Sequence, residues 1–107
     1  MKTLDPEREK EFLEVLQVFP DDPLPRFGLA NLYRDAGQLE DAIIQYRKAI
    51  ACDPEYGAAY LELGALEEQL GLTDAARETY RNAIMAAEKK GDLHIKNRAT
   101  MRLEDLS

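Results

Sequence analysis

The residue types that most often carry out chemistry are few and isolated in this chain. His94 has no second histidine or cysteine nearby to complete a metal site, and Cys52 has neither a cation nor a helix N-terminus beside it to activate its thiol. The adjacent carboxylates Glu67 and Glu68 would diverge by about 100° on a helix, which separates them for acid–base catalysis. No phosphate-binding loop or nucleophile elbow occurs. We therefore predict a non-enzymatic protein that uses no cofactor and no metal.

Charge and composition indicate which classes of partner are excluded and where in the cell the protein should be located. The formal net charge is -7, which would repel the phosphate backbone of a nucleic acid. The N-terminus has no apolar run typical of a signal peptide, and no window approaches a transmembrane helix in length and apolarity. We expect a cytoplasmic protein whose partner is another protein, with no binding of nucleic acid or membrane.

Comparing the sequence with itself reveals repeated segments that should position these side chains. A shift of 34 residues superposes small, apolar and aromatic residues on residues of the same kind. The matching pairs are Leu29 and Leu63, Leu32 and Leu66, Gly37 and Gly71, Ala42 and Ala76, Tyr46 and Tyr80, Ala49 and Ala83, and Ile50 and Ile84. The same shift backward places Phe12 on Tyr46 and Val15 on Ala49. The sequence therefore contains two full units and a preceding half unit.

Each full unit is predicted to form two helices. Asp22 is a good N-cap before Pro23, and Gly37 stands where a left-handed residue ends a helix. The second helix of this unit should end at Asp53, because Pro54 disfavours helical geometry in the residue before it. In the second unit, Thr73 is a candidate N-cap for the second helix.

The two ends of the chain depart from this plan. Near the N-terminus, a helix should run to about Phe19 and turn Phe12, Val15 and Leu16 inward. Near the C-terminus, Glu88 stands where the first unit has a proline, so a helix can continue until Gly91. A last helix should then begin after Asp92 and carry three apolar residues on one face, namely Ile95, Ala99 and Leu103.

These features predict an all-α protein with about six helices. We interpret residues 1–107 as one domain built from four consecutive parts. These are an N-terminal half-repeat helix (1–20), a first repeat (23–56), a second repeat (57–90) and a C-terminal capping helix (92–106).

The order of these residues resembles the tetratricopeptide repeat (TPR) family. The residues that carry the resemblance are Leu29, Ala30, Tyr33, Gly37, Ala42, Tyr46, Ala49 and Pro54, then Leu63, Gly64, Gly71, Ala76, Tyr80 and Ala83. The whole chain is also similar to small stand-alone bacterial members with two repeats and a C-terminal helix. The resemblance implies a TPR-like α-solenoid of antiparallel helix hairpins in a right-handed superhelical stack.

The resemblance also implies where a partner would bind. In this family the first helices of successive units line an inner wall on which peptides or partner helices lie. The equivalent side chains here are Leu24, Phe27, Asn31, Arg34, Ala58, Leu61, Ala65, Glu68 and Gln69. Among them Leu24, Phe27 and Leu61 should form an exposed apolar patch. The family therefore suggests an adaptor that holds a peptide or helix of another protein.

Three alternatives qualify this expectation. The chain's own last helix could cover part of the wall, or the same patch could join two copies in a homodimer.

Some members of the family bind the C-terminal carboxylate of chaperones with Lys, Asn and Arg, but only Asn31 matches that set here. Phe27 and Glu62 occupy other positions of the set, so we predict no such clamp. An acidic protein should instead prefer an apolar or basic segment.

Overall fold

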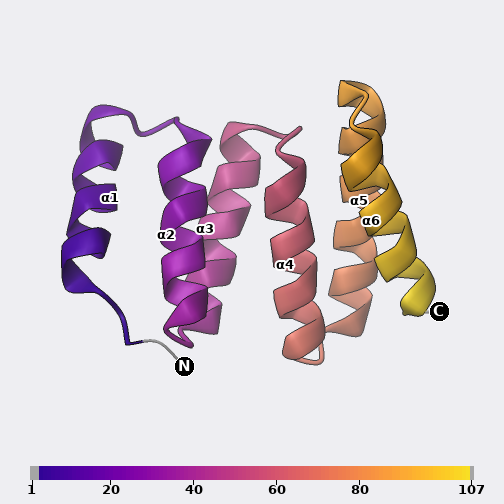
Figure 1. The fold of residues 1–107 in the computed structure, drawn as a ribbon, viewed down its shortest axis with the longest axis horizontal. Helices are drawn as coiled ribbons and strands as arrows, with labels where there is room; N and C mark the ends of the chain where they lie inside the picture. The colour runs from indigo at the N-terminus through magenta and orange to yellow at the C-terminus, as the bar shows by residue number, and fades with distance from the viewer. Residues whose placement is uncertain (1–2, 107) are drawn as a thin grey trace. The chain divides into compact units, whose positions relative to one another are not determined.

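The computed structural model describes residues 3–106, which form six α-helices and no strands (Figure 1). The helices are α1 (Pro6–Val18), α2 (Pro23–Asp35), α3 (Leu39–Cys52), α4 (Gly57–Gln69), α5 (Thr73–Lys90) and α6 (Leu93–Asp105). The chain divides into two compact units, residues 1–53 and 54–107. The predicted all-α fold is confirmed.

Local capping signals fix the helices of the first unit. The Asp22 carboxylate accepts a hydrogen bond from the backbone N–H of Leu24 at 3.0 Å, and Pro23 occupies the first helical position, as predicted. Gly37, with φ 79°, reverses the chain between α2 and α3. Helix α3 ends immediately before Asp53, where the following proline prevents its continuation.

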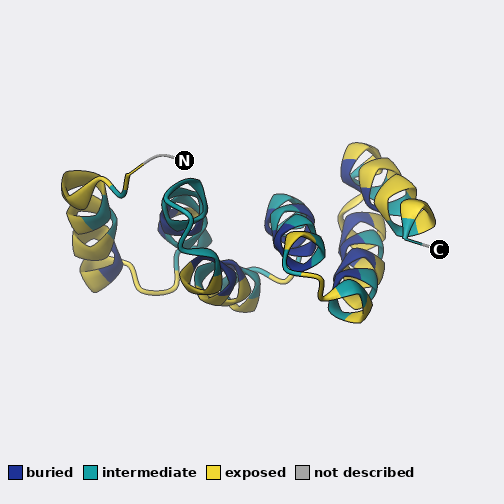
Figure 2. Ribbon diagram, turned by 90° about the horizontal axis from the view of Figure 1, so that it is seen from below, coloured by how far each residue is buried: buried dark blue, intermediate teal, exposed yellow. Residues whose placement is uncertain are grey.

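The core of the first unit lies between α2 and α3, with α1 packed on α2. Leu29 and Tyr46 are fully buried. The ring of Phe12 lies against the backbone of Gly28, so close that a Cβ atom there would come within 2.5 Å of it. Leu16 is buried as predicted, but Val15 is 41% exposed. The prediction that Val15 points inward is wrong, because α1 packs on α2 alone in this unit and most of its surface is exposed (Figure 2).

The second unit contains α4, α5 and α6. Helix α5 has 18 residues where α3 has 14, which follows from the replacement of the helix-ending proline by Glu88. Gly91, with φ 77°, ends α5, and the Asp92 carboxylate caps α6 by accepting from the Ile95 N–H at 3.1 Å. The prediction for Thr73 is wrong: it is the first residue inside α5, and no side chain caps this helix.

The core of the second unit is centred on Tyr80, which is fully buried against Gly64. The carboxylate of Glu67 is also buried and accepts a hydrogen bond from the Thr79 hydroxyl. Helix α6 packs on α5 and reaches α4, where the Ile95 side chain lies against Gly57. The absence of a side chain at residues 57 and 64 therefore allows α4 to lie close to both neighbouring helices.

Candidate partner-binding surface

The four predicted residues of α2 lie along one side of that helix. Leu24 is 64% exposed, and Phe27, Asn31 and Arg34 are half-buried. The Phe27 ring lies beside the Tyr46 ring, with centroids 5.7 Å apart and planes tilted by 58°. This tilted arrangement is a favourable geometry for aromatic pairs, so Phe27 is held in place by α3.

The polar end of this row is held by the same tyrosine. The Tyr46 hydroxyl donates a hydrogen bond to the Asn31 amide oxygen and accepts one from the Arg34 guanidinium at 3.2 Å. Arg34 also forms an ion pair with Asp35 at 3.2 Å. Tyr46 therefore contacts Phe27, Asn31 and Arg34, and it fixes three of the four side chains before any partner arrives.

The predicted residues of α4 differ in exposure. Gln69 is exposed and Ala58 and Ala65 are half-buried, but Leu61 is only 8% exposed. The expectation that Leu61 belongs to an exposed apolar patch is wrong. Leu61 lies one turn after Gly57, which packs against Ile95 of α6, and one turn before Gly64, which packs against Tyr80 of α5.

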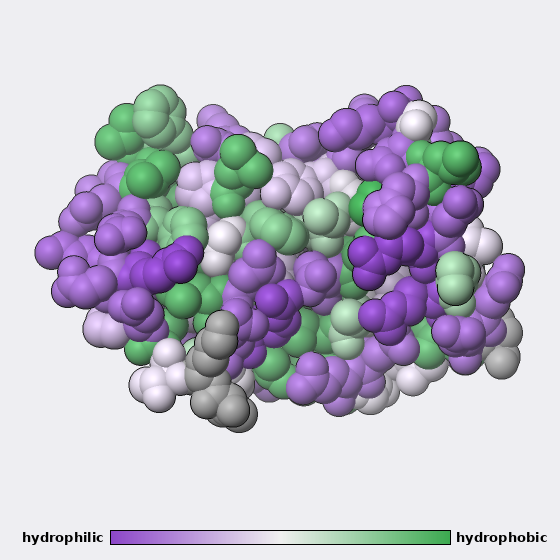
Figure 3. All heavy atoms as spheres, viewed as in Figure 1, coloured by the Kyte–Doolittle hydropathy of each residue, from purple (hydrophilic) through white to green (hydrophobic). Residues whose placement is uncertain are grey.

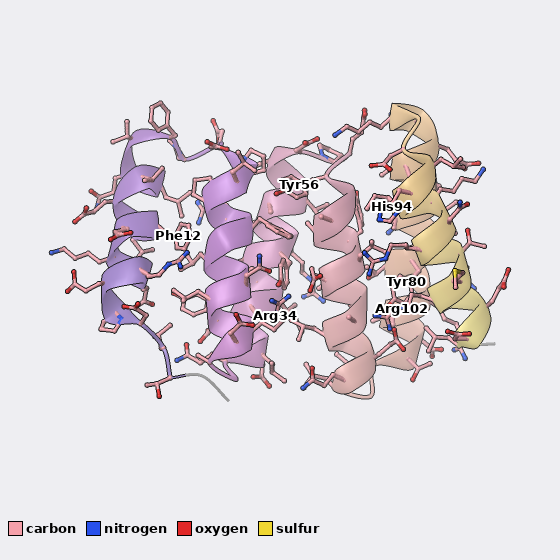
Figure 4. All side chains as sticks on the ribbon, viewed as in Figure 1. Phe12, Arg34, Tyr56, Tyr80, His94 and Arg102 are labelled. Atoms are coloured by element: carbon pink, nitrogen blue, oxygen red, sulfur yellow. The ribbon has the colours of Figure 1, made fainter. Side chains whose placement is uncertain are left out.

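Glu68 is the most constrained member of the α4 row. Its carboxylate accepts a hydrogen bond from the buried Tyr80 hydroxyl and lies 3.6 Å from the Arg102 guanidinium of α6 (Figure 4). Burial, followed by the hydrogen bond to Glu68, raises the pKa of Tyr80 well above its ordinary value of 10.0. Helix α6 therefore contacts the predicted surface at Glu68.

Helix α6 repeats the burial pattern of α2 and α4. In each of the three helices, the residues three and seven positions after the N-cap are buried. These residues are Pro25 and Leu29 in α2, Ala59 and Leu63 in α4, and Ile95 and Ala99 in α6. Counted from its N-cap, α6 is therefore a third helix of the kind that begins each repeat.

This equivalence adds two residues that sequence reasoning missed. Counted from the N-caps, His94 is equivalent to Leu24, and Met101 is equivalent to Asn31. Met101 is 64% exposed and His94 is also exposed. The N-cap Asp92 was the signal that could have found them, because the fixed shift of 34 residues does not align α6 with α4.

Hollows occur within both units, and two of the larger ones differ in their relation to the predicted residues. One of about 480 Å³ lies between α1 and α2 and is lined by the predicted residue Asn31 together with Arg8 and Asp35. A larger one of about 720 Å³ lies beside Tyr60 and Met85, and none of the predicted residues lines it. The volume of a hollow therefore does not by itself identify the predicted residues as a binding surface.

The structure also bears on metal binding and on membrane insertion. Within residues 3–106, no group of three or more His, Cys, Asp or Glu side chains is arranged to hold a metal ion. In the same range, no helix combines the length and apolarity needed to cross a membrane.

The fold and these helix rows define a helical-repeat protein, and comparison with known proteins identifies the family. Residues 30–71 match a family model described as TPR repeat, and residues 57–93 match one described as tetratricopeptide repeat. A TPR repeat-containing protein of Pseudomonas aeruginosa is 31% identical over 86 residues, which cover 80% of this chain and 82% of the relative. The chain belongs to the tetratricopeptide repeat family.

Solved structures agree with this assignment. A tetratricopeptide repeat domain protein of Salinibacter ruber has a TM-score of 0.77 and 27% identity, covering 82% of this chain and 89% of that one. The TPR2B domain of yeast Sti1, in complex with pHsp70, has a TM-score of 0.83 and 18% identity, covering 92% and 78%. The second likeness concerns the fold alone. Family and fold together support a protein-interaction module.

Proposed function

We propose that this chain is a non-enzymatic adaptor that binds a peptide or helix of another protein. The candidate contact residues are the predicted row on α2 in the first unit and, in the second unit, the predicted residues of α4 other than the buried Leu61, together with His94 and Met101 of α6. The complex of the Sti1 domain with pHsp70 supports a protein partner, because a domain of the same fold is bound there to another protein.

The single observation that carries the proposal is the row on α2. Tyr46 holds Phe27, Asn31 and Arg34, while Leu24 stays 64% exposed beside them. Side chains that are already ordered lose less conformational entropy on binding, which favours affinity. An exposed apolar residue next to fixed polar groups is also the usual composition of a recognition surface.

The charges favour an apolar or basic partner segment. The net charge of -7 steers cations toward the chain, and Glu68 places a carboxylate in the α4 row. Arg34, the cation of the α2 row, already pairs with Asp35. A carboxylate on the partner would therefore meet repulsion at Glu68 and competition at Arg34, which is consistent with the predicted lack of a carboxylate clamp.

Selection of peptides from a random display library tests this proposal. The immobilised chain should enrich sequences that combine apolar and basic residues, and fluorescence anisotropy should then measure binding of the best peptide. We expect Leu24→Glu and Met101→Glu each to weaken that binding by about tenfold or more, because each places a charge where an apolar contact forms.

Ile44→Glu is the matched control. Ile44 is 48% exposed on α3, so the change adds the same charge at similar exposure outside the proposed rows. Equal losses in all three variants would contradict the proposed surface, as would enrichment of acidic peptides. A self-associating unit is the alternative: a homodimer that Leu24→Glu or Phe27→Glu separates, with no peptide enriched, would replace the adaptor.

A further inference from the structure

Exposed apolar residues gather where α1 ends and the chain turns toward α2. Val15 is 41% exposed, Val18 68% and Phe19 60%. Phe19 is the C-cap, and its N–H donates to the Val15 carbonyl at 2.8 Å, so the spacing of three and four residues places all three on one side of the helix end. The space-filling view shows apolar side chains over the end of α1 and the following turn (Figure 3). We call these three residues the turn patch.

The turn patch borders the apolar end of the row on α2. Phe12 lies against Gly28, and Arg8 and Leu32 line the same hollow. A step of four residues back along α1 thus matches a step of four forward along α2, so the two helices are antiparallel. The same register places the last turn of α1 beside Leu24, which is 64% exposed. The apolar surface is therefore continuous across the two helices of this unit.

Carboxylates border the turn patch without a basic residue to balance them. Glu11 and Glu14 each stand one turn before a patch residue, and Asp21 follows the patch in the turn; all three are exposed. Within residues 3–106, none of the three forms an ion pair. Residues 11–25 contain four acidic residues and no lysine, arginine or histidine. The patch therefore combines exposed apolar area with uncompensated negative charge.

Helix α5 shows how carboxylates are balanced elsewhere. Asp74 and Glu78 pair with Arg77 and Arg81, each three residues later, at 2.7 and 3.7 Å. In α1, the residues three and four positions after each of the two patch-bordering glutamates are Glu, Val, Gln and Val. Internal pairing of the type seen in α5 is therefore not available toward the end of α1.

The basic residues of α1 lie before the patch. Arg8 stands two turns before Val15, and its guanidinium lies over the Phe12 ring at 5.6 Å from the centroid. Lys10 is exposed one turn before Glu14 but forms no ion pair with it. A ligand centred on the end of α1 would therefore meet carboxylates first.

We propose that the turn patch is a second docking surface, which binds an amphipathic helix whose apolar stripe is flanked by lysine or arginine residues. The stripe packs on the patch, because apolar residues spaced by three and four form a ridge that fits the groove of another helix. The flanking cations pair with Glu11, Glu14 and Asp21 and orient the helix. Burial of apolar area supplies most of the affinity.

The same charges disfavour two other occupants. A second copy of this patch would bring like carboxylates together, and an anionic lipid surface would be repelled by them. The docking surface contains none of the residues of the proposed adaptor function. The two surfaces can therefore be tested separately, and either can fail alone.

NMR of the full ¹⁵N-labelled chain tests the proposal with a designed peptide of about 18 residues, a length that supports a helix, with leucines on one face and lysines on the other. We expect the largest chemical-shift changes at the turn patch. One control peptide has glutamate in place of lysine, and a second has the same composition with its leucines scattered around the helix. Both should bind about tenfold more weakly or worse.

Variants separate the apolar contribution from the charge. Phe19→Ser and Val18→Ser should each weaken binding of the leucine–lysine peptide by about fivefold, because each removes apolar contact area. Leu13→Ser is the matched control, since Leu13 is 45% exposed on another side of α1. Glu14→Lys should weaken binding by about threefold, whereas Glu104→Lys makes the same change in net charge at an exposed position of the second unit and should not. Circular dichroism checks that all variants fold.

Several outcomes would overturn the proposal. Equal binding of the scattered-leucine peptide would show that attraction between net charges is sufficient. Shift changes confined to Phe27 and Asn31 would assign the peptide to the row on α2, which would support the adaptor function and overturn this inference. No shift changes at about 1 mM peptide would also overturn it. So would self-association of the wild-type chain that Phe19→Ser abolishes, or binding to phosphatidylserine vesicles and not to the peptide.

Discussion

The backbone of Gly64 lies directly against the ring of Tyr80, so that a Cβ atom at Gly64 would come within 2.5 Å of the ring's Cε1 atom. Tyr80 is fully buried, and its hydroxyl is hydrogen-bonded to Glu68, so the ring has little freedom to move away. The first unit has Ala30, which is fully buried, at the equivalent position. The second hairpin therefore has no room for the methyl group that the first unit carries at this position.

Gly64→Ala should destabilise the protein although alanine favours helices. Overpacking against the ring costs about 1–3 kcal/mol, and the better helix propensity offsets about 1 kcal/mol, so we expect a net loss of about 1 kcal/mol in urea denaturation. Tyr80→Leu in the same chain should reduce the cost of Gly64→Ala, because the colliding ring is gone. If the two changes add independently, this contact is not the cause.

Gly71→Ala should destabilise the protein for a different reason. Gly71 has φ 76°, and no atom lies within 4 Å of a Cβ built there, so only the left-handed backbone opposes a side chain. We expect a loss of about 1 kcal/mol for alanine and a smaller loss for Gly71→Asn, since asparagine tolerates this conformation. Thermal unfolding of the two variants measures the difference. Losses that are equal, or larger for asparagine, would contradict this explanation.

Thr79→Val should leave a buried carboxylate with one hydrogen bond fewer. Glu67 is 2% exposed and accepts from the Thr79 hydroxyl, and valine keeps the shape of threonine but lacks the donor. We expect a loss of about 1–3 kcal/mol in free energy of unfolding. Thr79→Ser, which retains the hydroxyl, is the control and should lose less. The opposite order would show that the methyl group matters more than the hydrogen bond.

Tyr33 should lose its proton at a higher pH than an ordinary tyrosine, and the free energy of unfolding should therefore depend on this ionisation. Burial, then a hydrogen bond of 2.6 Å to Glu9 and the charge of that carboxylate, raise its pKa from 10.0 to about 12. The folded chain therefore keeps this proton longer than the unfolded chain. The associated stability is fully present below pH 10 and is lost as the pH rises through about 12.

Ultraviolet titration of the tyrosines measures this ionisation directly. In Glu9→Gln, the pKa of Tyr33 should fall but remain above 10.0, because burial is the largest cause of its shift. Tyr33→Phe provides the difference spectrum that assigns the signal. A Tyr33 signal that titrates at its ordinary pKa in the wild-type chain would contradict this geometry.

The sequence predicted the helices well because their signals are local. Asp22, Gly37 and Gly91 act through their own side-chain or backbone chemistry, which the structure confirms. Thr73 was misassigned because capping depends on the backbone angles of the residue before the helix, and Leu72 occupies that position. Val15 was misassigned because its burial depends on a helix that the first unit does not contain.

The candidate surface could be predicted only in part. The 34-residue register relates positions on α2 to positions on α4, but periodicity does not measure how deeply a side chain is buried, and so Leu61 was expected to be exposed. Glu88 lengthens α5, so the N-caps Tyr56 and Asp92 are 36 residues apart. A comparison at constant spacing therefore fails to align Met101 with the earlier rows.

The pairing of residues that lie close together along the chain has a consequence for folding. Tyr46 and Asn31 are 15 positions apart, and Tyr80 and Glu68 are 12 apart. Short chain loops close with a small loss of entropy, so each hairpin can nucleate rapidly from its own residues. Proteins built in this way open in sections, and amide hydrogens in one hairpin can exchange with solvent while those in the other remain protected.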